Sequence, residues 1–152
     1  MKFSINRELL LKPLLLVSGA VERKSTLPIL GNILFDVSGQ SLTLTATDLE
    51  LEMVAYTEID NQGDEGKLTI PARKLLDICK SLPENSQITF TVKDDTVKLS
   101  SGRSRYSLST LPASDFPNIE EWKGDVEFNL LKSELLRLIE STHFSMANQD
   151  VR

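Results

Sequence analysis

Three carboxylates recur at every second position in one stretch of the chain, and they are the first candidates for chemistry. Asp48, Glu50 and Glu52 would share one face of a β-strand, because strand side chains alternate between two faces. Two or three carboxylates on one face can hold a divalent cation, as a metal-dependent nuclease requires. We prefer the ordinary interpretation, the solvated face of an amphipathic strand, because no histidine or lysine stands near them in the sequence.

Other residue types that carry out catalysis are scarce. His143 is the single histidine and falls near the end of a predicted helix, where a cation stabilises the helix dipole. Cys79 is the single cysteine and lies on an apolar helix face, which favours a core residue over a nucleophile. Glycine-rich phosphate loops and serine nucleophile elbows are absent from the sequence. We therefore expect a protein that is not an enzyme and that needs neither a metal nor a cofactor.

Cations gather in two places that could face a phosphate backbone. Arg73 and Lys80 share the polar face of a predicted helix, and Arg23 and Lys24 are adjacent in the polar loop 20–26. Side chains of this kind contact phosphates without reading bases. Ordinary surface charge explains them equally well, and the residues alone leave the choice open.

A second cluster falls on the last strand predicted before residue 110. Charges on an edge strand usually prevent sheet-to-sheet pairing, whereas apolar residues on its alternate face favour a contact. This strand could therefore be a protected edge or one half of an interface. The cluster comprises Arg103, Arg105, Tyr106 and Leu108, with Lys74 placed near it by the repeat described next.

The elements that position these residues come from a repeated pattern. One sequence pattern begins at Phe3, at Leu68 and again at Phe128. It consists of an apolar residue, any residue, a second apolar residue, four further residues and a Leu-Leu pair. Each copy predicts a strand that runs directly into a helix, because the apolar spacing changes from two to helical. Asn6 is a suitable N-cap for the first helix, which should reach about Ser18. Pro13 should kink or split that helix.

Both complete copies continue into three predicted strands. Alternating apolar residues mark 33–37 and 42–46 in the first copy, and 88–92 and 97–99 in the second. The alternation slips by one residue between 46 and 49, which indicates a bulge or sharp bend near Thr47 and Asp48. Residues 2–110 therefore predict two β-α-β-β-β units with antiparallel sheets and two helices packed on one side, an α+β fold.

The last part of the chain predicts a linker and an incomplete third unit. We assign residues 1–120 to a first domain, 121–125 to a linker and 126–152 to the start of a second domain. Two prolines and several acids mark 111–125, with Phe116 and Trp122 as anchoring aromatics. Without the strands that follow in the other units, the apolar side chains of the third helix should stay exposed: Leu135, Leu136, Leu138 and Ile139.

Composition narrows the class of protein. The 152 residues are 40% hydrophobic, enough for a packed core, and the net charge of −5 shows no global basic bias. A basic face on an acidic body remains compatible with nucleic acid. Arg7, Glu8, Lys12 and Pro13 interrupt the apolar N-terminal run, which therefore predicts neither a signal peptide nor a membrane span. We expect a soluble cytoplasmic protein with no membrane partner.

Five segments together carry a specific resemblance. They are TLPILGN (26–32), TDLELEM (47–53), IPARKLLDIC (70–79), SGRSRYSLSTLPASDFPN (101–118) and FSMANQDVR (144–152). Over its whole length the chain closely resembles the bacterial sliding clamp family, the beta subunit of DNA polymerase III. The resemblance implies the DNA-clamp fold, in which three domains per subunit and two subunits joined head to tail form a ring around duplex DNA. This chain looks like the first domain and the opening of the second.

The resemblance also implies roles for individual residues. The helices of this family line the central hole, so positions Lys24, Arg73 and Gln149 are expected to contact DNA, with Lys80 and Arg23 as further cations. Position 24 is usually arginine in the family, and lysine keeps the charge but loses the planar fork. Histidine is frequent where Asn148 stands. The implied subunit interface consists of Lys74, Ile78, Arg103, Arg105, Tyr106 and Leu108.

We therefore interpret the chain as part of a processivity factor that encircles duplex DNA without sequence preference and tethers the replicative DNA polymerase. The resemblance implies a clamp-loader ATPase as a further partner, and a homodimer when the protein is full length. Two alternatives remain to be tested: the metal-dependent nuclease with Asp48, Glu50 and Glu52, and a β-rich interaction module without a nucleic-acid role.

Overall fold

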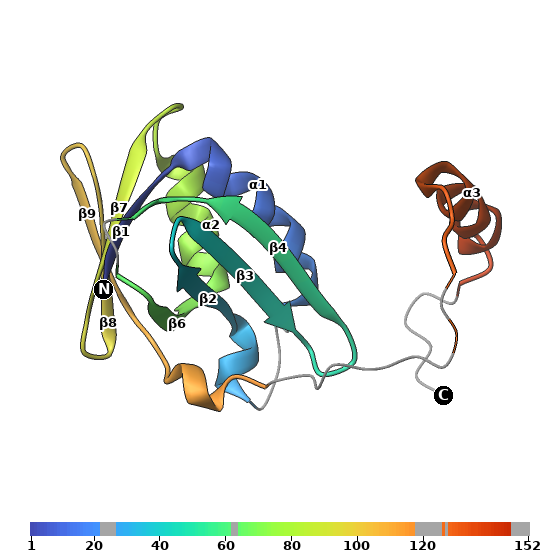
Figure 1. Ribbon diagram of the computed structural model, residues 1–152, viewed down its shortest axis with the longest axis horizontal. Coiled ribbons are helices and arrows are strands. Elements are labelled where there is room, and N and C mark those ends of the chain that lie inside the picture. Colours follow the sequence, from blue (N-terminus) through green and yellow to red (C-terminus); the bar gives the residue numbers. More distant parts are fainter. Residues whose placement is uncertain (22–26, 62–63, 118–125, 127, 147–152) are drawn as a thin grey trace. The chain divides into compact units, whose positions relative to one another are not determined.

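The computed structural model describes residues 1–21, 27–61, 64–117, 126 and 128–146, and the chain divides into two units, Met1–Ile119 and Glu120–Arg152. Figure 1 labels the principal elements. In order, the first unit contains β1 (Lys2–Asn6), α1 (Arg7–Val17), a 3-10 turn (Ser18–Ala20), a second one (Pro28–Gly31), β2 (Asn32–Ser38), β3 (Ser41–Thr47), β4 (Glu52–Glu58), β5 (Asp60–Asn61), β6 (Gly66–Pro71), α2 (Ala72–Ser81), β7 (Gln87–Lys93), β8 (Thr96–Ser101), β9 (Ser104–Ser109) and a third 3-10 turn (Ala113–Asp115).

The two predicted β-α-β-β-β units are confirmed, and they exchange their first strands. The strand orders are β5-β1-β7-β8-β9 in one sheet and β4-β3-β2-β6 in the other, with every pair antiparallel. Strand β1 of the first β-α-β-β-β repeat thus pairs with β7 of the second repeat. Strand β6 of the second repeat pairs with β2 of the first. Because each β-α-β-β-β repeat completes the other's sheet, the two repeats form one structure within Met1–Ile119. The sequence did not predict this exchange, nor the short strand β5 beside β1.

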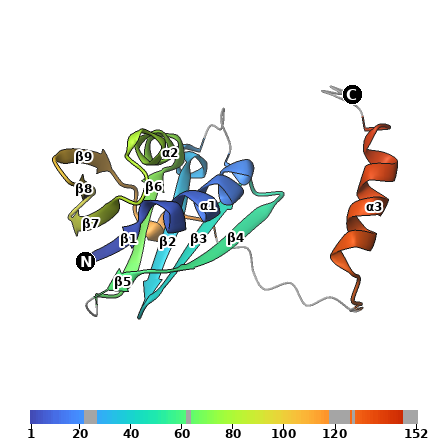
Figure 2. The same ribbon diagram turned by 90° about the horizontal axis from the view of Figure 1, so that it is seen from above.

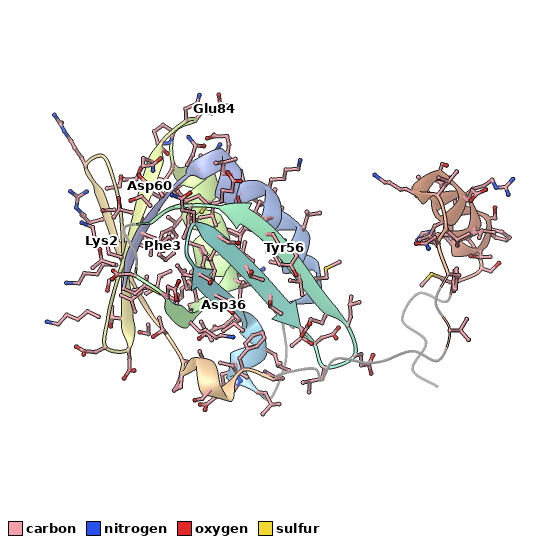
Figure 3. The ribbon with its side chains drawn as sticks, viewed as in Figure 1. Lys2, Phe3, Asp36, Tyr56, Asp60 and Glu84 are labelled. Carbon is pink, nitrogen blue, oxygen red and sulfur yellow. The ribbon has the colours of Figure 1, made fainter. Side chains whose placement is uncertain are left out.

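Three phenylalanines join the two sheets inside the core. Phe3 on β1 lies opposite Phe90 on β7, and their rings stack with centroids 4.7 Å apart. Phe35 on β2 meets the same Phe90 ring at 6.0 Å with a tilted geometry. All three are essentially inaccessible to solvent, and Phe3 is labelled on β1 in Figure 3. Phe90 therefore links both sheets through one side chain, in an aromatic geometry that adds to its hydrophobic burial.

Helix α1 begins as predicted but continues through its proline. The Asn6 side-chain oxygen accepts a hydrogen bond from the Glu8 amide at 2.9 Å, which confirms the N-cap. The helix runs unbroken from Arg7 to Val17, so Pro13 does not split it, and the kink that was the other expectation stays a prediction. The carbonyl of Leu9, which Pro13 cannot bond, accepts the hydroxyl of Thr57 instead.

Both helices lie side by side on the same side of the sheets, as predicted. Contacts join α1 to α2, α1 also packs on β4, and α2 also contacts β6. Figure 2 shows the two helices together over the strands, with α1 along β4. The buried side of α2 consists of Ala72, Leu75 and Cys79, which leaves its polar side facing solvent. The fold thus presents two helix faces on one surface.

The slip in alternation after Ala46 marks a tight hairpin turn. The Asp48 carboxylate accepts hydrogen bonds from the amides of Glu50 at 3.0 Å and Leu51 at 2.8 Å, and Leu49 adopts a left-handed φ of 80°. Strand β4 starts only at Glu52. The predicted sharp bend is confirmed, whereas the interpretation of Asp48, Glu50 and Glu52 as one strand face was wrong, because the first two lie in the turn.

The unit Glu120–Arg152 contains helix α3 (Lys132–His143), which confirms the third predicted helix. Residues 126 and 128–130 adopt no strand, so that part of the expected third repeat is not formed where the structure describes it. Four leucine and isoleucine side chains of α3 are between 48% and 52% exposed, as expected: Leu135, Leu136, Leu138 and Ile139. His143 falls in the last turn, where a cation suits the helix dipole.

Candidate nucleic-acid interface

The exposed faces of α1 and α2 carry the cations of the candidate interface. Arg73 and Lys80 on α2 are exposed, which agrees with their predicted positions on one polar face. Lys12 on α1 is also exposed, and the sequence analysis did not single it out. Its place four residues after Glu8, on the side opposite the buried stripe, was the signal that could have identified it. No ion pair between described residues involves Lys12, Arg73 or Lys80.

These faces carry fewer acids than cations, and one of the acids, Glu8, already accepts hydrogen bonds from other residues of the chain. Glu8 on α1 accepts hydrogen bonds from the Arg7 guanidinium at 2.8 Å and from the Asn85 amide at 3.0 Å. The Arg7 bond first, and the amide second, lower the pKa of Glu8 below its ordinary value. Asp77 on α2 is exposed. The arrangement can attract a polyanion by charge.

The predicted loop cations and the C-terminal contact lie outside the described residues. This applies to Arg23 and Lys24, to Asn148 and Gln149, and to the proposed anchor Trp122. Their roles therefore stay predictions. The other proposed anchor, Phe116, is buried against Ile29 and Leu30 in a small second core.

The predicted subunit interface falls on an edge strand, because β9 is the last strand of its sheet. Arg103 just before β9 and Arg105 on β9 are exposed, and the Arg105 guanidinium donates to the carbonyls of Gly102 and Ser104 at 2.7 and 2.9 Å. Leu108 is only 7% exposed and belongs to the main core. The apolar contact inferred for it is therefore already made within the chain.

The other interface candidates lie on α2 and on the inner side of β9. Lys74 is exposed on α2. Ile78 on α2 and Tyr106 on β9 are partly buried and pack against the main core, which leaves part of each side chain accessible. Whether these residues meet a second subunit stays a prediction.

Of the three acidic candidates, Asp48 has a structural role in the turn. The amides of Leu51 and Glu50 bond to the Asp48 carboxylate and lower its pKa. No group of three or more potential metal ligands occurs among the described residues. Cys79 is fully buried, and burial raises the pKa of its thiol to about 12. A thiol in that state is no nucleophile at neutral pH, so its assignment to the core is confirmed.

A buried polar centre, which the sequence analysis missed, fixes the segment that leaves β9. The Thr69 hydroxyl accepts hydrogen bonds from the Asn32 side-chain amide and the Leu111 amide, both at 3.0 Å, and donates to the Leu111 carbonyl at 2.8 Å. Thr69 stands between the apolar residues Leu68 and Ile70 on β6, where strand alternation alone gives no sign of a buried hydroxyl. Thr69 is nevertheless completely buried, and its hydroxyl is bonded to Leu111 in the segment that follows β9.

Comparison with known proteins places these features in a family. Residues 1–120 match the family described as DNA polymerase III beta subunit, N-terminal domain. The chain is 52% identical over 152 residues to the beta sliding clamp of Vibrio cholerae and 53% identical to that of Escherichia coli K12. It is covered completely in both alignments and spans 42% of the length of either relative.

Solved structures agree with the sequence comparison. A sliding clamp from Pseudomonas aeruginosa bound to griselimycin superposes with a TM-score of 0.93 at 52% identity, over 99% of this chain and 41% of that one. A clamp from Bartonella birtlesii, also bound to griselimycin, gives 0.94 at 34% identity, over 100% and 41%. The two antiparallel sheets and adjoining helices are thus those of the DNA-clamp class. The chain belongs to the DNA polymerase III beta subunit family, as the resemblance implied.

None of the helices in the described part of the chain has the length and hydrophobicity that crossing a lipid bilayer requires.

Proposed function

We propose that this chain forms the first domain, and the beginning of the second, of a sliding clamp that encircles duplex DNA. The observation that carries the proposal is the pairing of α1 and α2 on one surface, with Lys12, Arg73 and Lys80 exposed on it. Exposed cations of this kind bind phosphates in any sequence, because the contact does not involve base edges. The family membership supports the same conclusion.

The proposed action is topological and involves no bond chemistry. A closed ring cannot leave duplex DNA sideways, while phosphate contacts that ignore sequence allow it to slide. A replicative polymerase bound to the ring would find its primer end at a high effective concentration. We propose that a clamp-loader ATPase opens the ring and that the protein acts in the cytoplasm. Lys24, Arg23 and Gln149 complete the proposed DNA contacts.

Ring closure would use the edge strand β9. A head-to-tail ring needs a different surface at each end of the subunit, and an unpaired strand edge with exposed arginines suits an acidic partner edge. Arg103 and Arg105 would supply the charge, and Lys74 and Ile78 on α2 would belong to the same interface. Tyr106 would add apolar area, and Leu108 would support it from the core.

The test measures duplex-DNA affinity over a series of salt concentrations. It uses a full-length clamp, meaning a chain of the relatives' length that carries this sequence at its N-terminus. Arg73→Gln and Lys80→Gln should each reduce, by roughly 0.9, the magnitude of the slope of the logarithm of the DNA association constant against the logarithm of salt concentration. Each variant removes one phosphate contact. Lys98→Gln on the outward side of β8 is the matched control and should leave the slope unchanged. Unchanged slopes for both helix variants would refute the assignment.

A further inference from the structure

Helix α1 exposes two leucines, Leu15 and Leu16, that are not part of the hydrophobic core. Leu15 is 47% exposed and Leu16 is 61% exposed, although the first unit has a large core that could have taken them. Together with Glu8, Leu11 and Lys12 they line an open groove of about 450 Å³ along the helix. Two exposed leucines beside a lysine make this side of α1 a candidate contact surface.

The geometry of the helix sets Lys12 between the two leucines. Leu10, Pro13, Leu14 and Val17 form the buried stripe of α1. At 3.6 residues per turn, Lys12 points away from that stripe, and Leu15 and Leu16 lie three and four residues further on, to either side of it. The exposed face therefore presents one cation flanked by apolar surface.

Charge decides which occupant fits this face. Glu8 at one end of the groove is already bonded to Arg7 and to the Asn85 amide, so Lys12 is the charged group of the groove that is left without a protein partner among the described residues. On the adjoining helix the exposed cations Arg73 and Lys80 outnumber the exposed acid Asp77 on that face. The occupant should be anionic and should also offer apolar surface close to its charges. The sugar–phosphate backbone of duplex DNA has this character, because phosphates alternate with deoxyribose rings.

We propose that α1 makes a mixed contact with duplex DNA, in which Lys12 binds a phosphate and Leu15 and Leu16 pack on the neighbouring deoxyribose rings. The inference rests on the proposed function and deepens it. It divides the affinity of this helix into a part that depends on salt, from Lys12, and a part that does not, from the leucines. Counterion release accompanies only the first part.

The experiment compares variants of the full-length clamp in duplex-DNA binding at several salt concentrations. Lys12→Gln should lower the salt slope by roughly 0.9. Leu15→Gln combined with Leu16→Gln should weaken binding about tenfold at every salt concentration without changing the slope, because apolar burial is lost and no charge is removed. Leu51→Gln is the matched control: the same substitution, at a side chain that is 48% exposed in the β3–β4 turn, should leave DNA binding unchanged.

Three outcomes would overturn the inference. One is a double leucine variant that unfolds at the same temperature as the wild type and binds DNA with unchanged affinity. The second is an altered salt slope in that variant. The third is a double leucine variant with normal DNA binding but weakened self-association in sedimentation, which would identify Leu15 and Leu16 as part of an interface between copies of the protein. Failure of the wild-type clamp to bind duplex DNA would instead refute the proposed function itself.

Discussion

The hydroxyl of Thr57 on β4 donates a hydrogen bond to the carbonyl oxygen of Leu9 on α1, at 3.2 Å. Leu9 lies four residues before Pro13, and proline has no N–H to donate back to that carbonyl. A strand far along the chain thus supplies the bond that the helix cannot make itself. The Leu9 carbonyl is therefore hydrogen-bonded although Pro13 removes its partner within the helix.

We expect Thr57→Val to lower the free energy of unfolding by about 1 kcal/mol, since it removes the hydroxyl and keeps the shape of the side chain. In a Pro13→Ala background the same substitution should cost close to nothing, because the introduced alanine then donates its own N–H to the Leu9 carbonyl. Urea unfolding of the wild type, the two single variants and the double variant measures the coupling between Thr57 and Pro13. Thr45→Val on the neighbouring strand β3 serves as a control. An equal cost in both backgrounds would contradict the explanation.

The buried hydroxyl of Thr69 should be more costly to remove. Thr69→Val leaves the Asn32 side chain and the Leu111 backbone without their shared partner, so we expect a loss of about 1–3 kcal/mol in the free energy of unfolding. Thr69→Ser keeps the hydroxyl and should cost about 0.8 kcal/mol for its missing methyl group. Denaturant titration distinguishes the two. A valine variant as stable as the serine variant would show that the three bonds contribute little.

Asp48 should make the stability of the β3–β4 turn depend on pH. The amide hydrogen bonds lower its folded-state pKa below the ordinary value of 3.8. Its stabilising contribution is therefore complete above that ordinary value and disappears as the pH falls through the lowered pKa. Asp48→Asn should be less stable than the wild type at pH 7, and the difference should vanish in strong acid. Glu50→Gln controls for net charge, and a difference that does not change with pH would count against this account.

Reversal of charge on the edge of β9 should oppose ring closure. In the full-length clamp, Arg103→Glu combined with Arg105→Glu should raise the dimer dissociation constant at least about tenfold, because like charges then meet the expected acidic partner surface. Analytical ultracentrifugation measures the shift from dimer to monomer. Arg73→Glu, the same charge change on α2, should leave the dimer intact while weakening DNA binding. A double variant that stays dimeric at nanomolar concentration would remove β9 from the interface.

Local patterns in the sequence determined the elements and much of the candidate site. Alternating apolar residues located the strands on either side of the turns, and Asn6 identified the start of α1. Helical spacing placed Arg73 and Lys80 on the solvent side of α2 and Cys79 in the core. These features follow from the geometry of one strand or one helix, so neighbouring residues contain the information.

Only the tertiary structure decided which strands pair and which polar groups are buried. The exchange of β1 and β6 between the two units depends on the pairing of residues far apart in the sequence, and no local period records the partner of a strand. Thr69 is buried where its hydroxyl bonds to the distant Leu111, and the Leu9 carbonyl that Pro13 cannot bond receives the hydroxyl of the distant Thr57. The same long-range packing brings Lys12 and Arg73 to one surface on adjoining helices. Periodicity assigns each residue to a face of its own element, and the packing of distant elements determines what that face meets.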